Sequence, residues 1–228
     1  MPIIVLIRHG ENEFVKKGRL AGRLPGVHLN DKGNAQAQVV ADFLSNKLAE
    51  VPIKAIYSSP LERAMETAAP LAKALGVEVI QRHGLIETDC GEWQGKTLKS
   101  LNRQKIWKVV QQTPSIFTFP GGETFRDTQH RIVNEIQELA NQHEPNDVII
   151  CVSHSDPIRL AIAYFLGLSM DMFQRLIVAP ASINVLTLSP HGAGLLALNY
   201  STEFAFPKPT DKEKPASGNG KSEKMDKG

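Results

Sequence analysis

The sequence has few cysteines, no long apolar run and no large excess of charge. Cys90 and Cys151 are its only cysteines, and they lie far apart. Two such thiols are typical of packing residues in a reducing compartment, so we do not expect a disulfide. No run approaches the ~20 apolar residues that cross a bilayer, and the first residues lack a signal-peptide pattern. We therefore expect a cytoplasmic protein with no membrane partner.

The charges of the chain are nearly balanced. The sequence contains 26 Lys and Arg residues and 24 Asp and Glu residues. Six of the basic residues and four of the acids lie in residues 207–228, so the rest of the chain is formally neutral. This balance does not predict attraction to nucleic acid or anionic lipid. Any positive field must be local, as in one pocket.

Length and composition fit one folded domain followed by a tail. A chain of 228 residues with 42% hydrophobic content suits a single α/β domain, which we assign to residues 1–206. Residues 207–228 are rich in Lys, Pro, Gly, Ser and Asp, so we expect a disordered polar tail there. An inert solvated terminus is favoured over a regulatory or docking tail.

Short apolar runs alternate with segments of helical periodicity. Strands are predicted over residues 2–7, 53–57, 77–80, 147–152, 183–188 and 195–200. Helices are predicted after the N-caps Asn30 and Ser59, and over residues 97–112, 123–142 and 157–167. The turn-rich residues 189–194 favour a hairpin. The pattern predicts an α/β three-layer sandwich: a mostly parallel sheet, one antiparallel edge strand, and helices on both faces.

Five polar side chains follow the predicted strands. Arg8 and His9 end the first strand, and Arg63 lies in the first turn of the helix after the second. Glu87 follows the third strand, and His154 follows the strand 147–152. Because the carboxyl ends of parallel strands meet at one edge of the sheet, we expect these side chains to lie close together.

The chemistry of these side chains suits phosphoryl transfer. Arg8 and Arg63 carry forked donors that match a phosphoryl group. The two imidazoles could divide the roles of nucleophile and donor. Glu87 could protonate a leaving oxygen if its carboxyl stays protonated near neutral pH. Helix N-termini near Pro60 and Pro157 would add backbone N–H groups.

Each residue also has a structural interpretation. Taken alone, His154 could be a histidine at a helix start, Arg63 an exposed helical arginine, and Glu87 a solvated loop acid. Clustered histidines could also bind a metal, but this cluster contains arginines and no His-x-x-x-His pair, so no metal is expected. The other histidines have no such neighbours and are expected to be structural or on the surface: His28, His83, His130, His143 and His191.

Ordered motifs point to a known family. They are Leu6-Ile7-Arg8-His9-Gly10-Glu11 and residues 57–64, 91–95, 120–124 and 152–154. Over about residues 2–200 the chain resembles the histidine phosphatase superfamily, also called the phosphoglycerate mutase-like family. The resemblance implies that His9 is the nucleophile and becomes phosphohistidine, and that Glu87 is the acid. It also implies a phosphate pocket of Arg8, Arg63 and His154, no cofactor, and a small phosphorylated metabolite as substrate.

Some positions depart from the common pattern of that family. Asn12 stands where many members carry Thr, Val15 where a later Asn is common, and Ala21 where a polar residue often touches phosphate. Asp156 comes two residues after His154, in a stretch where many members have glycine directly after the histidine. The stretches 20–28 and 153–157 resemble a bacterial phosphomutase-like branch. The secondary phosphate contacts that the resemblance implies are Asn12, Gly22 and Ser155.

Three functions compete. Mutases of this family typically carry a longer, more basic segment between the acid and the second histidine, so the short segment 88–122 favours a phosphomonoesterase over a phosphoglycerate mutase. A phosphate-binding or scaffold protein would not need both a nucleophile and an acid.

The sequence leaves the oligomeric state open. Eight apolar residues could form an entrance to the site that favours a bulky leaving group, although such residues more often lie in the core. They are Leu24, Pro25, Val27, Trp93, Trp107, Ile116, Phe117 and Phe119.

Overall fold

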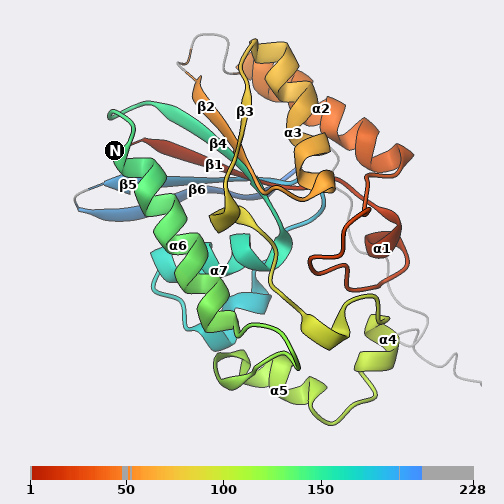
Figure 1. Cartoon of the computed structure of the whole chain (residues 1–228). Coiled ribbons are helices and arrows are strands. Elements are labelled where there is room, and N and C mark those ends of the chain that lie inside the picture. Colours follow the sequence, from red (N-terminus) through yellow and green to blue (C-terminus); the bar gives the residue numbers. More distant parts are fainter. Residues whose placement is uncertain (1, 48–50, 52, 190, 202–228) are drawn as a thin grey trace, which may run out of the picture.

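The computed structural model describes residues 2–47, 51, 53–189 and 191–201. Their strands form one sheet in the order β3-β2-β4-β1-β5-β6. The bounds are β1 (Ile3–Arg8), β2 (Ile53–Ser58), β3 (Val79–Gln81), β4 (Val148–Ser153), β5 (Ile183–Ser189) and β6 (Gly192–Tyr200). The pairings among β1 to β4 are parallel, whereas β5 pairs antiparallel with β1 and with β6. This confirms a mostly parallel sheet with an antiparallel edge and a hairpin (Figure 1).

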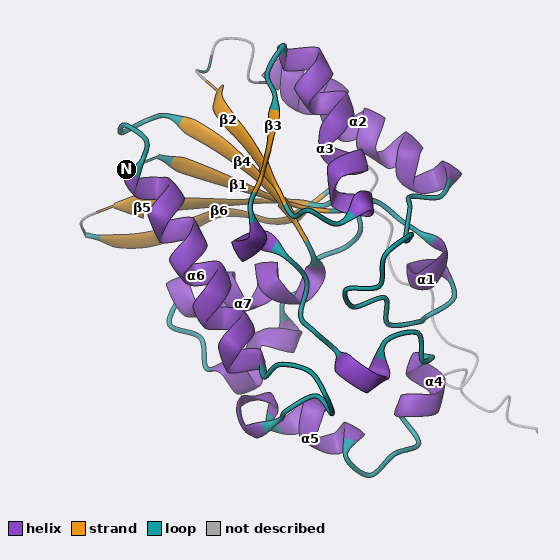
Figure 2. Cartoon of the chain, viewed as in Figure 1, coloured by secondary structure: helices purple, strands orange, loops and turns teal. Residues whose placement is uncertain are grey.

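Helices cover both faces of the sheet, as Figure 2 shows. Helices α2 (Asp31–Lys47) and α3 (Glu62–Leu75) pack on one face, and α6 (Phe125–Asn141) and α7 (Ser155–Phe165) on the other. Along β1, Ile4 and Leu6 join the core beneath α6 and α7, while Val5 and Ile7 join the core beneath α2 and α3. A strand that is apolar at every position is therefore buried on both sides.

Short elements surround the carboxyl edge of the sheet. They are α1 (Glu13–Lys16), α4 (Leu98–Leu101), α5 (Trp107–Gln112) and the 3₁₀ helices η1 (His83–Leu85), η2 (Gly91–Trp93), η3 (Pro114–Ile116) and η4 (Met170–Arg175). A third apolar cluster, which includes Trp93, Leu101, Val110 and Phe173, packs η2, α4, α5 and η4 together. The prediction of one helix over 97–112 is wrong. Residues 102–106 are all exposed, so no buried face supports a continuous helix there.

The helix boundaries agree with some predicted caps and not with others. The Asn30 side chain accepts from the Gly33 N–H at 2.8 Å at the start of α2, as expected. Helix α3 begins at Glu62 rather than directly after Ser59, and its N-cap is Leu61; the Ser59 hydroxyl accepts from Leu61 N at 3.4 Å and lies 2.8 Å from His154 Nε2. Helix α7 begins at Ser155, which places Pro157 within its first turn, where a missing N–H is tolerated.

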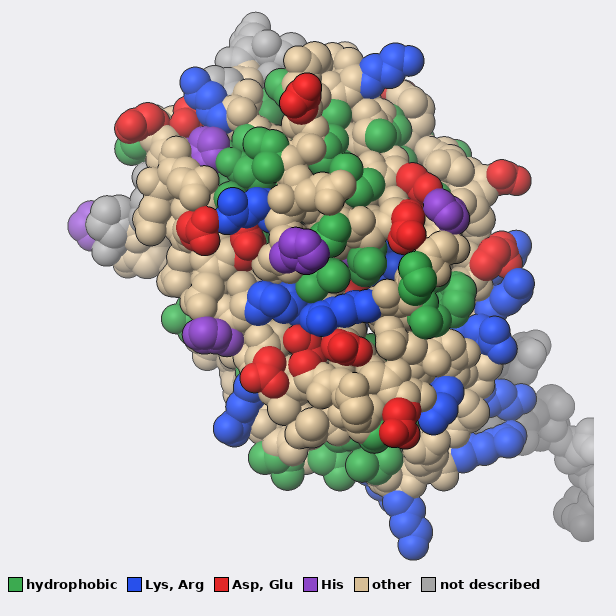
Figure 3. All heavy atoms as spheres, in the orientation of Figure 1, with side chains coloured by type: hydrophobic (Ala, Val, Ile, Leu, Met, Phe, Trp, Pro, Cys, Tyr) green, Lys and Arg blue, Asp and Glu red, His purple; other side chains and the backbone are tan. Residues whose placement is uncertain are grey.

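Expectations drawn from composition have mixed outcomes. Cys90 and Cys151 are buried free thiols, as predicted. Within the described ranges, no helix is long and apolar enough to cross a membrane. Basic and acidic side chains lie next to one another on the face shown in Figure 3. The predicted tail, 207–228, lies outside the described residues, so the domain boundary stays a prediction.

Candidate active site

The ends of β1, β2 and β4 bring two imidazoles together. The sheet hydrogen bonds continue one residue past the strands: His9 N donates to Ser153 O at 3.0 Å, and Ser59 N donates to Val152 O at 2.9 Å. His9 and His154 therefore lie side by side, with ring centroids 5.1 Å apart and ring planes at 61°. Both rings are buried.

A cavity of about 400 Å³ opens beside these rings. Of the residues predicted to form the site, Arg8, His9, Asn12, Gly22, Arg63, Glu87 and Ser155 line it. His154 packs against His9 instead. The fold therefore brings every predicted site residue to one place, although they lie up to about 150 positions apart in the sequence. The rest of the wall is partly apolar and partly charged, and includes Arg19, Leu20, Trp107, Phe119, Asp156 and Arg159.

A buried arginine, Arg63, and a half-buried one, Arg8, place positive charge at the cavity. Arg63 is 1% exposed, and its Nη2 donates to the Gly22 carbonyl at 2.7 Å. Arg8 Nη1 donates to the Val178 carbonyl at 2.7 Å. Arg8 Nε and both Nε and Nη1 of Arg63 are buried without a partner. Because unpaired buried donors are costly, this group indicates an anion site.

The hydrogen bonds of His9 fix which of its nitrogens is basic. Nδ1 lies 2.7 Å from the Gly10 carbonyl oxygen, which can only accept, so Nδ1 carries the proton and Nε2 keeps its lone pair. Burial and the charges of Arg63 and Arg8 hold the pKa of His9 well below its ordinary 6.5. The ring is therefore neutral and can act as a nucleophile.

His154 is held from the opposite side. Its Nε2 lies 2.8 Å from the Ser59 hydroxyl, while Nδ1 is buried without a hydrogen-bond partner and lies 3.9 Å from Glu87 Oε2. Burial and the neighbouring Arg63 charge hold the pKa of His154 well below its usual value. The Ser59 hydroxyl can donate to Nε2 or accept from it; when it donates, the neutral ring carries its proton on Nδ1, on the side where Glu87 lies.

Glu87 has the properties of a carboxylic acid rather than a carboxylate. Burial and the negative charge of Asp156 raise the pKa of Glu87 from 4.5 to about 7, against the opposing charge of Arg63. Its Oε1 accepts from the Thr88 N–H at 2.9 Å. Near neutral pH a substantial fraction of Glu87 is protonated and can donate to a leaving oxygen.

The predicted secondary contacts differ in what they do. The Asn12 side chain caps α1 by accepting from Val15 N at 2.9 Å, and its Nδ2 is buried without a partner. Gly22 offers its carbonyl to Arg63. Ser155 lines the cavity from the first residue of α7.

Three residues of the site were not assigned to it from the sequence. Ser59 directly follows a strand at the carboxyl edge of the sheet, and this position could have marked it as a site residue. Arg159 lies three residues after Asp156 on α7, a spacing that places both on one helix face. For Asp156 the sequence left two roles open, capping of the helix or orientation of the substrate.

Only some of the residues proposed for an apolar entrance line the cavity. Of the predicted apolar entrance, Trp107 and Phe119 line the cavity, while Val27, Trp93 and Phe117 are core. The five histidines set aside do not line it. Among the described residues, no three His, Cys, Asp or Glu side chains could hold a metal ion.

Known proteins with similar sequences and folds are phosphatases and mutases. The family model "Histidine phosphatase superfamily (branch 1)" matches residues 4–201. Phosphoserine phosphatase 1 of Hydrogenobacter thermophilus is 30% identical over 200 residues, which cover 87% of this chain and 92% of that protein. A 2,3-bisphosphoglycerate-dependent phosphoglycerate mutase of Thermoplasma acidophilum is 32% identical over 186 residues, covering 82% of this chain and 87% of that protein.

A similar solved structure contains a bound phosphomonoester. It is a mutant phosphoserine phosphatase of Entamoeba histolytica in complex with phosphoserine, with 27% sequence identity and a TM-score of 0.76. The similarity covers 87% of this chain and 97% of that one. The resemblance therefore extends over most of both chains.

Proposed function

Because this chain belongs to the histidine phosphatase superfamily and is a phosphatase enzyme, we propose that it hydrolyses its phosphomonoester through a phosphohistidine on His9. The observation that supports this route most is the group of buried, unpartnered donors of Arg8, Arg63 and His154 beside a neutral His9. Preorganised donors of this kind stabilise charge on the transferring oxygens.

The proposed reaction has two steps. In the first, the lone pair of His9 Nε2 forms a bond to phosphorus while the bond from phosphorus to the leaving oxygen breaks. The protonated Glu87 gives its proton to that oxygen. In the second step, the water oxygen forms a bond to phosphorus while the bond from phosphorus to His9 Nε2 breaks and its electron pair returns to Nε2. The Glu87 carboxylate takes the proton from this water, and inorganic phosphate leaves. Dividing one difficult displacement in this way lowers both barriers.

The surrounding side chains support the phosphoryl group. We assign Arg8, Arg63 and the Nδ1–H of His154 to its oxygens. The unpartnered Nδ2 of Asn12 and the cavity-lining position of Ser155 favour further contacts to them. Gly22 contributes indirectly, by holding Arg63 through its carbonyl.

A trapping experiment tests the covalent step. The protein is mixed with a radiolabelled phosphomonoester, quenched in alkali, and separated from free label. We expect a labelled protein that is stable in alkali and loses its label in acid, as a phosphohistidine does. If turnover proceeds with no such species in the wild type, the covalent route is wrong.

Mutase activity is the second candidate, because the Thermoplasma acidophilum mutase is similar over most of both chains. A mutase retains the phosphoryl group and returns it to a phosphoglycerate. Interconversion of phosphoglycerates, stimulated by a bisphosphoglycerate and faster than release of inorganic phosphate, would establish this alternative.

Charges of both signs line the cavity in addition to the proposed phosphate contacts. Asp156 and Arg159 both face it and pair at 3.4 Å, and Arg159 Nε is buried without a partner. A carboxylate this close to an anion site is favourable when the substrate brings its own cation. We propose that the leaving group carries an ammonium and a carboxylate, as in phosphoserine. The similar phosphoserine phosphatases support this choice.

Exchange of Asp156 tests this specificity. Asp156→Asn is expected to lower kcat/KM for phosphoserine by ~10-fold or more, the usual effect of losing a hydrogen bond between charged groups. The loss for 3-phosphoglycerate, which has a carboxylate but no ammonium, should be smaller by that factor. The matched variant Arg159→Gln should affect both of these substrates and spare phosphoethanolamine, which has no carboxylate.

The comparison among substrates separates recognition from chemistry. Asp156 also affects the pKa of Glu87, but that effect changes all three substrates alike. Equal losses of kcat/KM for phosphoserine, 3-phosphoglycerate and phosphoethanolamine in both variants would show that Asp156 and Arg159 do not recognise the charged groups of the leaving group.

We also propose a cytoplasmic, bacterial setting for this enzyme. The buried free thiols of Cys90 and Cys151 suit a reducing compartment, and the Hydrogenobacter relative supports a bacterial origin. Small phosphorylated metabolites are the proposed partners, with no part assigned to nucleic acid or membrane.

A further inference from the structure

Glu87 lies outside every regular element of the sheet and its covering helices. It follows η1 and precedes η2, in a segment that has neither helix nor strand from Ile86 to Cys90. No ladder or helical hydrogen bond fixes its backbone. The position of its carboxyl relative to His9 therefore depends on contacts from other parts of the chain.

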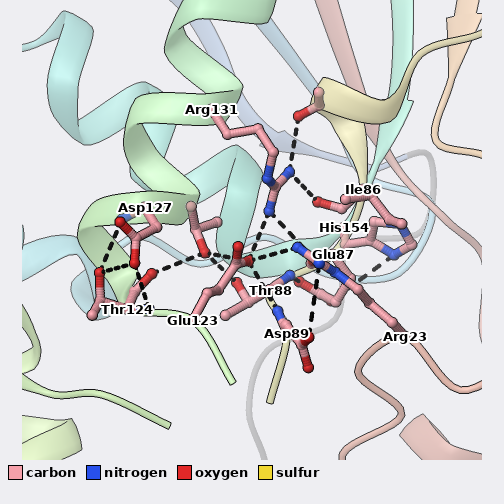
Figure 4. A network of polar contacts seen from close by, with 12 residues as sticks. Arg23, Ile86, Glu87, Thr88, Asp89, Glu123, Thr124, Asp127, Arg131 and His154 are labelled. Carbon is pink, nitrogen blue, oxygen red and sulfur yellow. Dashed lines mark hydrogen bonds and ion pairs between the residues drawn. The ribbon is translucent and has the colours of Figure 1, made fainter. Parts of the chain in front are cut away.

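Two arginines bind the main chain of this segment. Arg131, on α6, donates through Nη1 to the carbonyls of Gly84 and Ile86 at 3.0 and 2.8 Å, and through Nη2 to Glu87 O at 3.4 Å. Arg23 Nε donates to the same Glu87 carbonyl at 2.8 Å. Figure 4 shows both guanidinium groups converging on the backbone of Glu87.

A single carboxylate oxygen orders both arginines. Glu123 Oε1 accepts from Arg23 Nη2 at 2.9 Å and from Arg131 Nη2 at 2.8 Å. It also accepts from the Asp89 N–H at 2.9 Å and from the Thr128 hydroxyl at 2.8 Å. The Glu123 side chain is 17% exposed, so these charge-assisted bonds are largely shielded from water. Without this negative charge the two guanidinium groups would repel each other.

The backbone on either side of Glu123 also packs against the segment after Glu87. A Cβ atom on Gly122 would lie 2.3 Å from Asp89 O, and one on Gly91 would lie 2.2 Å from Pro120 O. Only glycine fits such approaches. Glu123 N donates to Asp89 O at 3.1 Å, which closes the contact. The motifs at 91–95 and 120–124 thus meet each other, and neither supplies a side chain to the proposed phosphate contacts.

We propose that Glu123 is a positioning residue which, through Arg23 and Arg131, holds the backbone of Glu87 so that its carboxyl reaches the leaving oxygen. This inference rests on the proposed function, because it requires Glu87 to be the acid. Glu123 itself makes no contact with the reacting atoms. Its loss should therefore weaken protonation of the leaving group and leave attack by His9 largely intact.

The dependence of rate on the leaving group tests this role. Phenyl, p-nitrophenyl and 2,4-dinitrophenyl phosphate are similar in shape, and their phenols are successively more acidic, so they need progressively less help from an acid. For Glu123→Gln we expect kcat/KM to fall ~10²-fold for phenyl phosphate and less than ~3-fold for 2,4-dinitrophenyl phosphate. A purely structural loss would lower all three equally, and that result would overturn the proposal.

Control variants make the result specific. Glu66→Gln removes a carboxylate on α3 that accepts from Leu29 N and His28, away from the Glu87 segment, and it should keep the wild-type dependence on the leaving group. If Glu123→Gln does not fold, Arg131→Lys keeps the charge but loses the forked contacts, and it should give the same signature. In Glu87→Gln, adding Glu123→Gln should have little further effect, because both act on one proton transfer.

The outcomes separate this inference from the function on which it rests. Glu87→Gln could lose kcat/KM selectively for phenyl phosphate while neither Glu123→Gln nor Arg131→Lys does so. In that case the positioning role of Glu123 is wrong, and the assignment of Glu87 as the acid is kept. If Glu87→Gln itself shows no selectivity, the acid assignment is wrong and the inference falls with it. If Glu123→Gln and Glu87→Gln each lose kcat/KM selectively for phenyl phosphate, and the double variant loses little more than Glu87→Gln alone, the proposal is supported.

Discussion

Replacing His9 by alanine is expected to lower kcat by at least ~10⁴-fold for every phosphomonoester, because it removes the nitrogen that is proposed to form the covalent intermediate. The donors of Arg8 and Arg63 remain in this variant. Binding of inorganic phosphate, measured by calorimetry, should therefore stay within a few-fold of the wild type. Steady-state release of phosphate from p-nitrophenyl phosphate measures the loss of turnover.

The matched control is another histidine. His130 is exposed on α6 and does not line the cavity, so His130→Ala should retain wild-type turnover. Circular dichroism of both variants checks that the fold is kept. A His9→Ala protein that folds normally and keeps even one tenth of the activity would rule out His9 as the nucleophile.

Replacing Glu87 by glutamine is expected to lower kcat/KM for phenyl phosphate by ~10²–10³-fold, the range of general acid catalysis. The loss for 2,4-dinitrophenyl phosphate should be small, because its phenolate leaves without a proton. The amide cannot accept a proton from water either, so hydrolysis of phosphohistidine should slow. Rapid-mixing measurements should then show a burst of dinitrophenol equal to the enzyme concentration.

The pH profile gives an independent view of the same residue. Since the pKa of Glu87 is raised to about 7, its acidic form predominates below that pH and is lost above it. Wild-type kcat/KM for phenyl phosphate should therefore fall as pH rises through about 7. His9 should add no acidic limb near 6.5, because its pKa is depressed and it stays neutral there. An alkaline limb that persists unchanged in Glu87→Gln would contradict the assignment.

The strands and the residues that follow them could be predicted from the sequence. Buried parallel strands read as continuous apolar runs, and such strands end at a common edge, so the positions of His9 and His154 follow from the pattern alone. Glu87 was predicted on the same basis, and the resemblance to a family added the roles. Pattern and resemblance thus predicted the side chains to which the proposed phosphate contacts are assigned.

The contacts behind those side chains could not be predicted. Glu123 and Arg131 appear in the sequence as ordinary charges at the start of a helix and on its surface. Their role arises from a contact between segments more than 30 residues apart, which no local periodicity records. In residues 97–112 the sequence instead predicts more structure than is formed. Their apolar spacing is helical, but residues 102–106 are all exposed, so no packing stabilises a helix there.

The position of β1 in the sheet has a consequence for biosynthesis. This first strand pairs on one side with β4, from Ile3 opposite Val148, and on the other with β5, from Ile3 opposite Thr187. A ribosome must therefore translate most of the domain before either edge of β1 finds its partner. Until then a nascent chain exposes an apolar strand that chaperones can bind. His9, which directly follows β1, reaches its place in the cavity only after β4 and β5 have been translated.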